Sequence, residues 1–294
     1  MNLLYLVFGD AVRNHFQAQF SILSFLRHRA GLSGITVVTD APDFYRHLAG
    51  HVTVLPIDAA TLREWKGEFD FFWRVKIKAL EYVAGRSPGQ AILYLDTDTF
   101  LYGSFAALQQ ALAAGTAFMH EPEGALSALG SKTEKLMWRQ TNGRTFGGIK
   151  LHERHAMWNA GVVGIPAVGG PAAIALALAI CDDLSRQDVT PRLIEQFALS
   201  VALQEQFELR AARPYIGHYW SNKDEWNDAI SLFLLESSLR ARTVDEEVAA
   251  LADFNFRAVP VKKMLKNTRW RLVHLVDWLF PPRETVYAGD EPTA

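Results

Sequence analysis

Two aspartates directly follow a run of apolar residues. Residues 91–95 lead straight into Asp96, Thr97 and Asp98. In an extended chain the side chains at positions i and i+2 emerge on the same side, so the two carboxylates repel each other unless a cation lies between them. Hard divalent cations prefer oxygen ligands, and such an ion can neutralise a bound diphosphate. The pattern predicts a divalent-metal site, and a strand-end turn with two solvated aspartates is the alternative interpretation.

The elements that position this pair alternate between strand-like and helix-like patterns. Such alternation predicts a mostly parallel sheet covered by helices on both faces. Functional sites in such sheets form beyond the carboxyl ends of the strands, which is where the aspartates lie. The candidate strands span residues 3–8, 35–39, 52–56, 91–95 and 160–165, and the candidate helices span 16–29, 73–84 and 105–114.

Composition limits the class of protein. The 294 residues are 49% hydrophobic, enough for one large α/β domain with an appendage. The net charge of −2 offers no basic field for nucleic acid, and we expect no nucleic-acid partner. The single cysteine, Cys181, favours a reducing compartment. The start of the chain lacks the charged and apolar pattern of an export signal, so we expect a cytoplasmic protein.

Two further segments invite a structural interpretation. The uncharged stretch 157–181 contains Pro166 and Pro171, which predict a strand (160–165) and a helix (172–181) in place of a membrane span. The polar stretch 123–155 carries several glycines, among them Gly130, Gly143, Gly147 and Gly148, and breaks the strand–helix alternation. A long irregular stretch in a compact domain is either a functional lid or disordered.

The last forty residues differ in character from the rest. Residues 261–280 hold five Lys or Arg against one Asp, with apolar residues near one helical face. A helix packed on the domain, a helix lying on an anionic membrane and a helix in a partner's groove all fit this pattern. We therefore divide the chain into a domain at 1–257 and a basic amphipathic helix with its tail at 258–294.

Three later segments carry a family resemblance. Residues 158–165 (WNAGVVGI), 195–199 (EQFAL) and 217–223 (GHYWSNK) follow the aspartate pair in order. Together with that pair they resemble the motifs of family 8-like retaining glycosyltransferases of the GT-A fold, a group that includes glycogenin and lipopolysaccharide galactosyltransferases. The resemblance covers residues 1–230.

The resemblance implies a role for each matching residue. Asp96, Asp98 and His218 would bind the metal, Mn²⁺ or Mg²⁺. Gln196 would lie beside the anomeric carbon, and Glu195 would bind sugar hydroxyls. The residues implied to contact the rest of the substrate are Gly9, Asp10, Asn14, Arg74, Lys76, Lys78, Thr97, Asn159, Ala160, Gly161 and Lys223.

Some positions qualify this reading. Basic residues two apart on a helix do not share a face, so only some of Arg74, Lys76 and Lys78 can reach one ligand. Phe197 stands where the family commonly has a second acid, and the segment after Trp220 lacks the family's glycine and proline. Both departures leave the donor sugar open.

The implied activity is metal-dependent transfer of a hexose from a UDP-sugar to a glycan or lipid-linked acceptor, with retention at the anomeric carbon. A haloacid-dehalogenase-like phosphatase is one alternative, although its motif resembles DxDxT and Phe100 occupies the fifth position here. A catalytically silent scaffold that binds sugar nucleotides is another. The basic segment adds an anionic membrane surface as a partner, which would place a cytoplasmic protein on the inner face of the membrane.

Overall fold

A seven-stranded sheet forms the centre of the computed structural model, which describes residues 1–263, 272, 275–276 and 278–280. Strand β11 runs antiparallel to both of its neighbours, β4 and β6, and the other six strands share one direction. In spatial order the strands are β12 (Leu209–Ala211), β6 (Ala117–Met119), β11 (Val162–Ile165), β4 (Ile92–Leu95), β1 (Asn2–Val7), β2 (Gly34–Thr39) and β3 (Thr53–Pro56). This mixed, mostly parallel sheet confirms the predicted α/β fold class.

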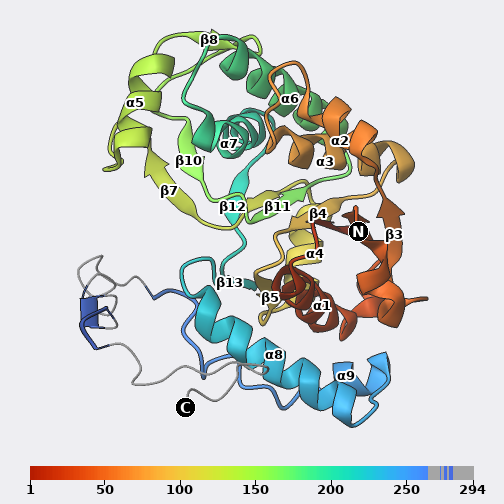
Figure 1. Ribbon diagram of the computed structural model, residues 1–294. Helices are drawn as coiled ribbons and strands as arrows, with labels where there is room; N and C mark the ends of the chain where they lie inside the picture. Colours follow the sequence, from red (N-terminus) through yellow and green to blue (C-terminus); the bar gives the residue numbers. More distant parts are fainter. Residues whose placement is uncertain (264–271, 273–274, 277, 281–294) are drawn as a thin grey trace.

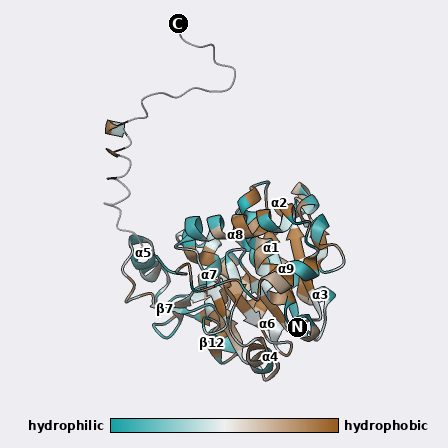
Figure 2. Cartoon of the chain, turned by 90° about the horizontal axis from the view of Figure 1, so that it is seen from below, coloured by the Kyte–Doolittle hydropathy of each residue, from teal (hydrophilic) through white to brown (hydrophobic). Residues whose placement is uncertain are grey.

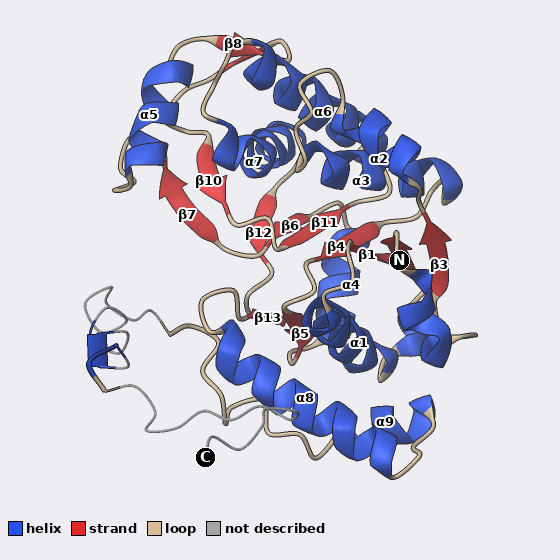
Figure 3. Cartoon of the chain, in the orientation of Figure 1, coloured by secondary structure: helices blue, strands red, loops and turns tan. Residues whose placement is uncertain are grey.

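Helices cover both faces of the sheet (Figures 1 and 3). One face carries α2 (Ala59–Lys66), α3 (Arg74–Arg86), α5 (Lys132–Thr141), α6 (Gly170–Arg186) and α7 (Ile194–Gln206). The other face carries α1 (Val12–Leu26), α4 (Phe105–Ala113), α8 (Lys223–Leu239) and α9 (Val244–Ala250). Short 3-10 helices span Arg29–Gly31, Pro42–Leu48 and Pro191–Leu193.

Alternation along the central strands divides the interior into two cores. Leu4 packs into the core beneath α3, α6 and α7, whereas Leu3 and Tyr5 pack into the core beneath α1 and α8. Successive strand side chains point to opposite faces, and a strand covered on both sides is therefore apolar throughout. Figure 2 shows hydrophobic residues concentrated along the sheet and on the helix faces turned toward it.

Three small two-stranded sheets extend from the central one. The pair most relevant to the aspartates is β5 (Thr99–Leu101) with β13 (Ile216–His218), which are antiparallel. The other pairs are β7 (Pro122–Ala125) with β10 (Ala156–Trp158) and β8 (Thr145–Phe146) with β9 (Ile149–Lys150).

The uncharged stretch 157–181 forms β11 and α6, with Pro166 between them and Pro171 in the first turn of the helix. This confirms the predicted strand and helix. Among the described residues, no helix combines the length and apolar character that crossing a membrane requires.

The prediction of a long irregular segment at 123–155 is wrong. The segment contains β7, α5, β8 and β9. Helix α5 begins at a capping box, in which Ser131 and Glu134 satisfy each other's backbone N–H groups. Met137 and Phe146 are fully buried and attach the segment to the core. The glycines mark its turns, because Gly143, Gly147 and Gly148 all have positive φ.

Most of the predicted C-terminal helix lies outside the described residues. The chain just before it packs on the domain, because the Pro260 carbonyl accepts hydrogen bonds from Asn222 Nδ2 (2.8 Å) and Trp226 Nε1 (3.2 Å). The proposed boundary at residue 258 therefore cuts through a stretch that contacts α8.

The capping box gives a prediction for the order of α5. Replacing the cap, Ser131→Ala, should destabilise the helix N-terminus by about 1 kcal/mol. Hydrogen exchange of the amide of Glu134 and its neighbours should accelerate about fivefold, because an exposed helix end gains little from packing. The control is Lys132→Ala, because Lys132 directly follows Ser131 and its side chain has no partner among the described residues. Equal exchange in both variants would show that the cap does not hold this segment.

Candidate active site

Asp96, Asp98 and His218 converge at the carboxyl end of β4. One ligand atom from each residue lies within 4.8 Å of the others. Asp96 directly follows β4, and Asp98 directly precedes β5. The pairing of β5 with β13 aligns Thr99 with His218, which brings together residues 120 positions apart in the chain. The structure therefore assembles the three residues that the family resemblance implied as metal ligands.

The aspartate pair lies in a turn between β4 and β5, which corrects the extended geometry assumed from the sequence. The turn is fixed from both sides. Asp96 donates its backbone N–H to the Gly161 carbonyl (2.8 Å), and Tyr219 donates its own to the Asp98 carbonyl (3.1 Å). The carboxylates converge because these bonds hold the turn, and not because the strand continues.

Lys76 is a buried cation beside two carboxylates. Its Nζ lies 3.5 Å from Asp96 Oδ1 and 3.0 Å from Glu195 Oε1, and it donates to the Ala160 carbonyl at 3.2 Å. Burial alone would lower the pKa of this ammonium, but Asp96 and Glu195 outweigh it and raise the pKa above its ordinary value. Tyr94 completes the group by donating its hydroxyl to Asp96 Oδ1 at 2.6 Å. Tyr94 therefore orients the side chain of Asp96, and the ammonium group of Lys76 offsets its negative charge.

Asp98 is buried between His218 and Lys223. Its Oδ1 lies 3.3 Å from His218 Nε2, and its Oδ2 lies 2.9 Å from Lys223 Nζ. Burial acts to raise the pKa of Asp98, but His218 and Lys223 together hold it below its ordinary value. Asp98 is therefore available as an anionic ligand.

The donor set fits a hard or borderline divalent cation. Two carboxylates and one imidazole leave coordination positions open for oxygens of a substrate. His218 Nδ1 is buried and has no hydrogen-bond partner in the described part of the chain. A buried ring nitrogen without a hydrogen-bond partner is chemically suited to bind a cation.

These residues lie on the wall of a cleft of about 500 Å³. Its size falls in the range typical of small-molecule sites. The lining residues are Leu6, Val7, Phe8, Asn14, Phe72, Trp73, Lys76, Tyr94, Asp96, Thr97, Asp98, Asn159, Ala160, Gly161, Gln196, His218, Trp220 and Lys223.

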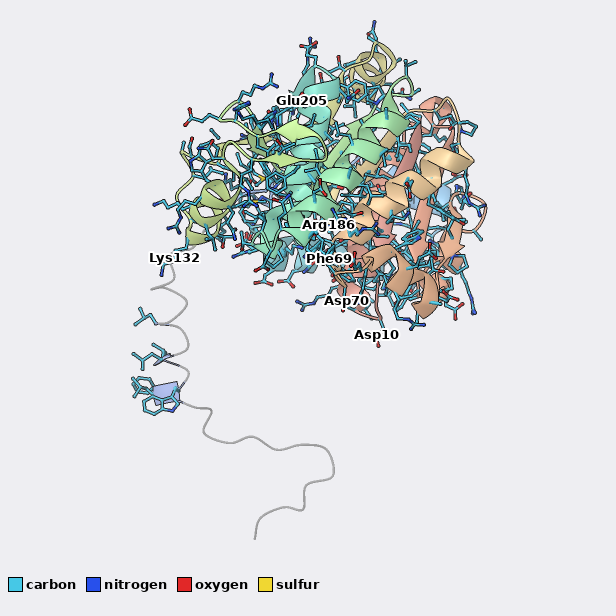
Figure 4. The ribbon with its side chains drawn as sticks, turned by 90° about the horizontal axis from the view of Figure 1, so that it is seen from above. Asp10, Phe69, Asp70, Lys132, Arg186 and Glu205 are labelled. Atoms are coloured by element: carbon cyan, nitrogen blue, oxygen red, sulfur yellow. The ribbon has the colours of Figure 1, made fainter. Side chains whose placement is uncertain are left out.

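Five of the residues expected at the substrate lie outside this lining. Arg74 forms a two-pronged ion pair with Asp182 (2.6 and 3.0 Å), and Lys78 pairs with Glu81. Of Arg74, Lys76 and Lys78, only Lys76 lines the cleft. Glu195 is buried behind it. Gly9 and Asp10 lie at the exposed end of β1, and Figure 4 shows Asp10 at the edge of the molecule.

Glu123 is a site residue that the sequence reasoning missed. Its carboxylate accepts hydrogen bonds from Asn159 Nδ2 (3.2 Å) and Gln196 Nε2 (3.0 Å). Both residues line the cleft, and Glu123 fixes the orientation of their amide groups. Its position after β6 at the sheet edge was the available signal, because polar residues at strand ends are site candidates.

Exposed aromatic side chains were missed as well. Trp73 is 52% exposed, and Phe72 and Trp220 are also partly open to solvent. All three line the cleft. Exposed aromatics at a cleft commonly stack on flat ligands. The sequence 71–73 (FFW) was the available signal: three consecutive aromatic residues before an amphipathic helix cannot all face the core, and only Phe71 packs against it.

Gly161 lines the cleft, and the structure shows a further role for it. The resemblance placed it beside the donor sugar, where a missing side chain allows close approach. In the structure a Cβ at this position would lie 2.1 Å from His218 Cε1, so the glycine makes room for the imidazole. The Asn159 side chain accepts the Gly161 N–H at 3.0 Å and shapes this turn.

His120 lies behind His218. The two rings are perpendicular, at 86°, with centroids 4.9 Å apart. Burial lowers the pKa of His120 to about 3, and the neighbouring His218 adds to this shift. His120 is therefore a neutral imidazole at physiological pH.

Comparisons with known proteins add the following. No family model matches the sequence, and no curated protein matches it. Solved structures with some similarity include the galactosyltransferase LgtC in complex with donor and acceptor sugar analogues, at 11% identity and a TM-score of 0.49, covering 72% of this chain and 74% of that one. An active-site mutant of LgtC has 11% identity and a TM-score of 0.46, with 72% of each chain covered. The apo form of mouse xyloside xylosyltransferase 1 has 13% identity and a TM-score of 0.44, with coverage of 72% and 85%.

All three are glycosyltransferases by name.

The contact between Gly161 and His218 gives a prediction. Gly161→Ala should displace the imidazole from Asp98, since the added methyl group and the ring cannot share the same space. Affinity for Mn²⁺, measured by titration calorimetry, should fall by at least about tenfold. Gly85→Ala on α3, where a Cβ meets nothing within 4 Å, is the control. Circular dichroism checks the fold, and wild-type Mn²⁺ affinity in the folded variant would argue against this role.

Proposed function

We propose that this protein is a metal-dependent glycosyltransferase that moves a hexose from a UDP-sugar to an acceptor hydroxyl of a glycan or lipid-linked glycan. The observation that carries the proposal is the convergence of Asp96, Asp98 and His218 on the wall of a cleft that can accommodate a nucleotide sugar. The order of the motifs along the chain supports the same activity.

Asp96, Asp98 and His218 would hold the cation, Mn²⁺ or Mg²⁺. When bound, the cation supplies positive charge that offsets the charge developing on the diphosphate. Lys223 adds to this charge. Its side chain is 48% exposed and now contacts Asp98 Oδ2, so it can turn toward a phosphate without losing buried packing. As a flexible point charge, a lysine suits a leaving diphosphate.

The nucleoside end of the donor would lie between Asn14 and the aromatic pair Phe72 and Trp73. The two rings meet edge to face, with centroids 5.3 Å apart. Trp73 offers an open face on which uracil can stack, and Asn14 offers an amide to the ribose or base. This places the base at the carboxyl end of β1, at the sheet edge where ligands of α/β folds bind.

The sugar would lie against Asn159 and Gln196, which Glu123 orients. Among the described residues, the only acids on the cleft wall are Asp96 and Asp98, both needed for the cation. Glu195 is engaged by Lys76, and Glu123 by two amides. No carboxylate is therefore free to attack the anomeric carbon, which favours retention by front-face transfer, with the Gln196 amide supplying a dipole.

In this transfer the bond between the anomeric carbon and the phosphate oxygen breaks, and its electron pair leaves with UDP. The acceptor hydroxyl oxygen forms the new bond from the same face and gives its proton to the leaving phosphate oxygen. The transition state resembles an oxocarbenium ion. The segment from β7 to β9 borders the sugar through Glu123, and we assign it the role of limiting access of water.

The membrane surface and the inner-face location remain part of this proposal. They depend on residues 261–280, most of which lie outside the described residues. A lipid-linked acceptor would bring the substrate to the same surface.

Asp98→Asn tests the proposed activity. The change preserves shape but removes the charge that the cation needs, so transfer should fall more than about 100-fold, because even the loss of an outer hydrogen-bond partner costs roughly 10–100-fold at metal sites. Thermal stabilisation by UDP with Mn²⁺ should also be lost. Release of UDP from UDP-hexoses is the measurement, and Asp228→Asn, exposed on α8, is the control.

Other outcomes identify other functions. UDP-hexose binding without cleavage in the wild-type protein would indicate a silent scaffold. Hydrolysis of a phosphomonoester would indicate a phosphatase. Either result would overturn the proposed glycosyltransferase activity.

Trp73→Ala tests the stacking of the base. Stacking on an aromatic residue contributes about 1–3 kcal/mol per base, so KM for the UDP-sugar should rise roughly 10–100-fold. The value of kcat should change little, because the base is bound equally in the ground and transition states. Phe69→Ala is the control, since Phe69 is also exposed but lies outside the cleft lining. An unchanged KM would place the base elsewhere.

A further inference from the structure

A second cleft, of about 610 Å³, adjoins the first. His218 and Trp220 line both clefts, so the metal-binding imidazole forms part of the wall between them. The far side of the second cleft comes from residues 254–262, which precede the C-terminal segment. A molecule in this cleft would therefore lie next to the site proposed for the sugar and diphosphate.

His120 is the buried polar group on this wall. Its side chain lines the second cleft, and the residue is 4% exposed. Neither ring nitrogen has a hydrogen-bond partner in the described part of the chain. Buried polar groups are nearly always paired, and an unpaired one requires an explanation. A ligand with hydroxyl groups would provide the missing partner.

The cleft also carries an excess of positive charge. Arg213 is balanced by Glu121, whose Oε2 lies 3.3 Å from Arg213 Nη1. Arg257 and Lys262 line the cleft and form no ion pair with any described residue. Glu121 is the only acid on the described wall, so two positive charges are left over. Such a surplus selects anionic ligands.

Apolar and aromatic residues make up much of the remaining wall. Phe256 and Val259 lie beside the cations, and Tyr102 is exposed at the rim. Flat apolar surfaces of this kind pack against the C–H faces of sugar rings, whereas an inorganic ion would gain nothing from them.

We propose that the second cleft is the acceptor subsite and that it selects a saccharide bearing an anionic group, a phosphate or a carboxylate. Arg257 and Lys262 bind the anion, and Tyr102 and Phe256 contact the sugar. A rotation of the His120 ring about its Cβ–Cγ bond turns a nitrogen toward the cleft, where it hydrogen-bonds an acceptor hydroxyl beside His218. The proposal rests on the proposed transferase activity, which it extends to the class of acceptor.

Binding measurements on the full chain test this assignment. Ligand-observed NMR, with UDP and diamagnetic Mg²⁺ present and ³¹P detection for inorganic phosphate, compares glucose, glucose 6-phosphate, glucuronic acid and inorganic phosphate. Glucose 6-phosphate and glucuronic acid should bind at least tenfold more tightly than glucose, and more tightly than phosphate alone. Equal binding of glucose would overturn the selection for an anion, and equal binding of phosphate would overturn the saccharide site.

Two variants locate the binding. The double variant Arg257→Gln with Lys262→Gln should lose the preference for anionic sugars while retaining wild-type affinity for UDP. Lys150→Gln with Arg192→Gln makes the same charge change outside both clefts and is the control. His120→Phe should weaken binding of all the sugars and leave the fold intact.

The results also separate this proposal from the one it extends. Loss of UDP affinity in the Arg257 and Lys262 double variant would assign these cations to the donor and overturn the acceptor site. Failure of the wild-type protein to bind or cleave UDP-hexoses would overturn the transferase, whereas the preference among sugars is measured independently of cleavage.

Discussion

The balance of charge at the carboxyl end of β4 is the constraint on which the site depends. Asp96, Asp98 and Glu195 bring three carboxylates to one buried edge of the sheet. At 4 Å and an effective dielectric constant near 20, two like charges repel by about 4 kcal/mol. Lys76 lies between Asp96 and Glu195, and Lys223 lies against Asp98. These two cations offset the repulsion among the carboxylates and allow them to lie close together.

Lys76 and Lys223 differ in how firmly the fold holds them. Lys76 is buried and also donates to the Ala160 carbonyl, so its position is fixed by the fold. Lys223 is half exposed at the first turn of α8 and holds Asp98 by a single contact. Lys76 therefore keeps Asp96 in position, whereas Lys223 can move away from Asp98 and leave its carboxylate to a divalent ion. The charge of Asp96 is therefore always offset by Lys76, whereas the charge of Asp98 can be offset either by Lys223 or by a bound ion.

The sequence was sufficient for the features that depend on local pattern. Apolar runs predicted five strands of the central sheet, and the two aspartates after β4 indicated where the candidate metal ligands lie. Features that depend on tertiary pairing were not accessible in the same way. The register of β5 with β13 brings His218 to Asp98, and only the family resemblance indicated that contact. Arg74 faces Asp182 on α6, a partner 108 residues away, which no helical periodicity specifies. The segment 123–155 looked irregular because its helix is short and polar, although the capping box at Ser131 was readable in the sequence.

The shared wall between the two clefts explains why so many elements converge on one imidazole. His218 ends β13, contacts Asp98 after β4, fits against Gly161 before β11 and meets His120 after β6. An imidazole that served only as a metal ligand would need to face the carboxylates but would not need close packing on its other sides. A ring that also forms the wall between the proposed donor and acceptor sites would have to stay in place when either is filled. Contacts from residues beside three other strands hold the ring, and the missing side chain at Gly161 is the local feature that makes room for it.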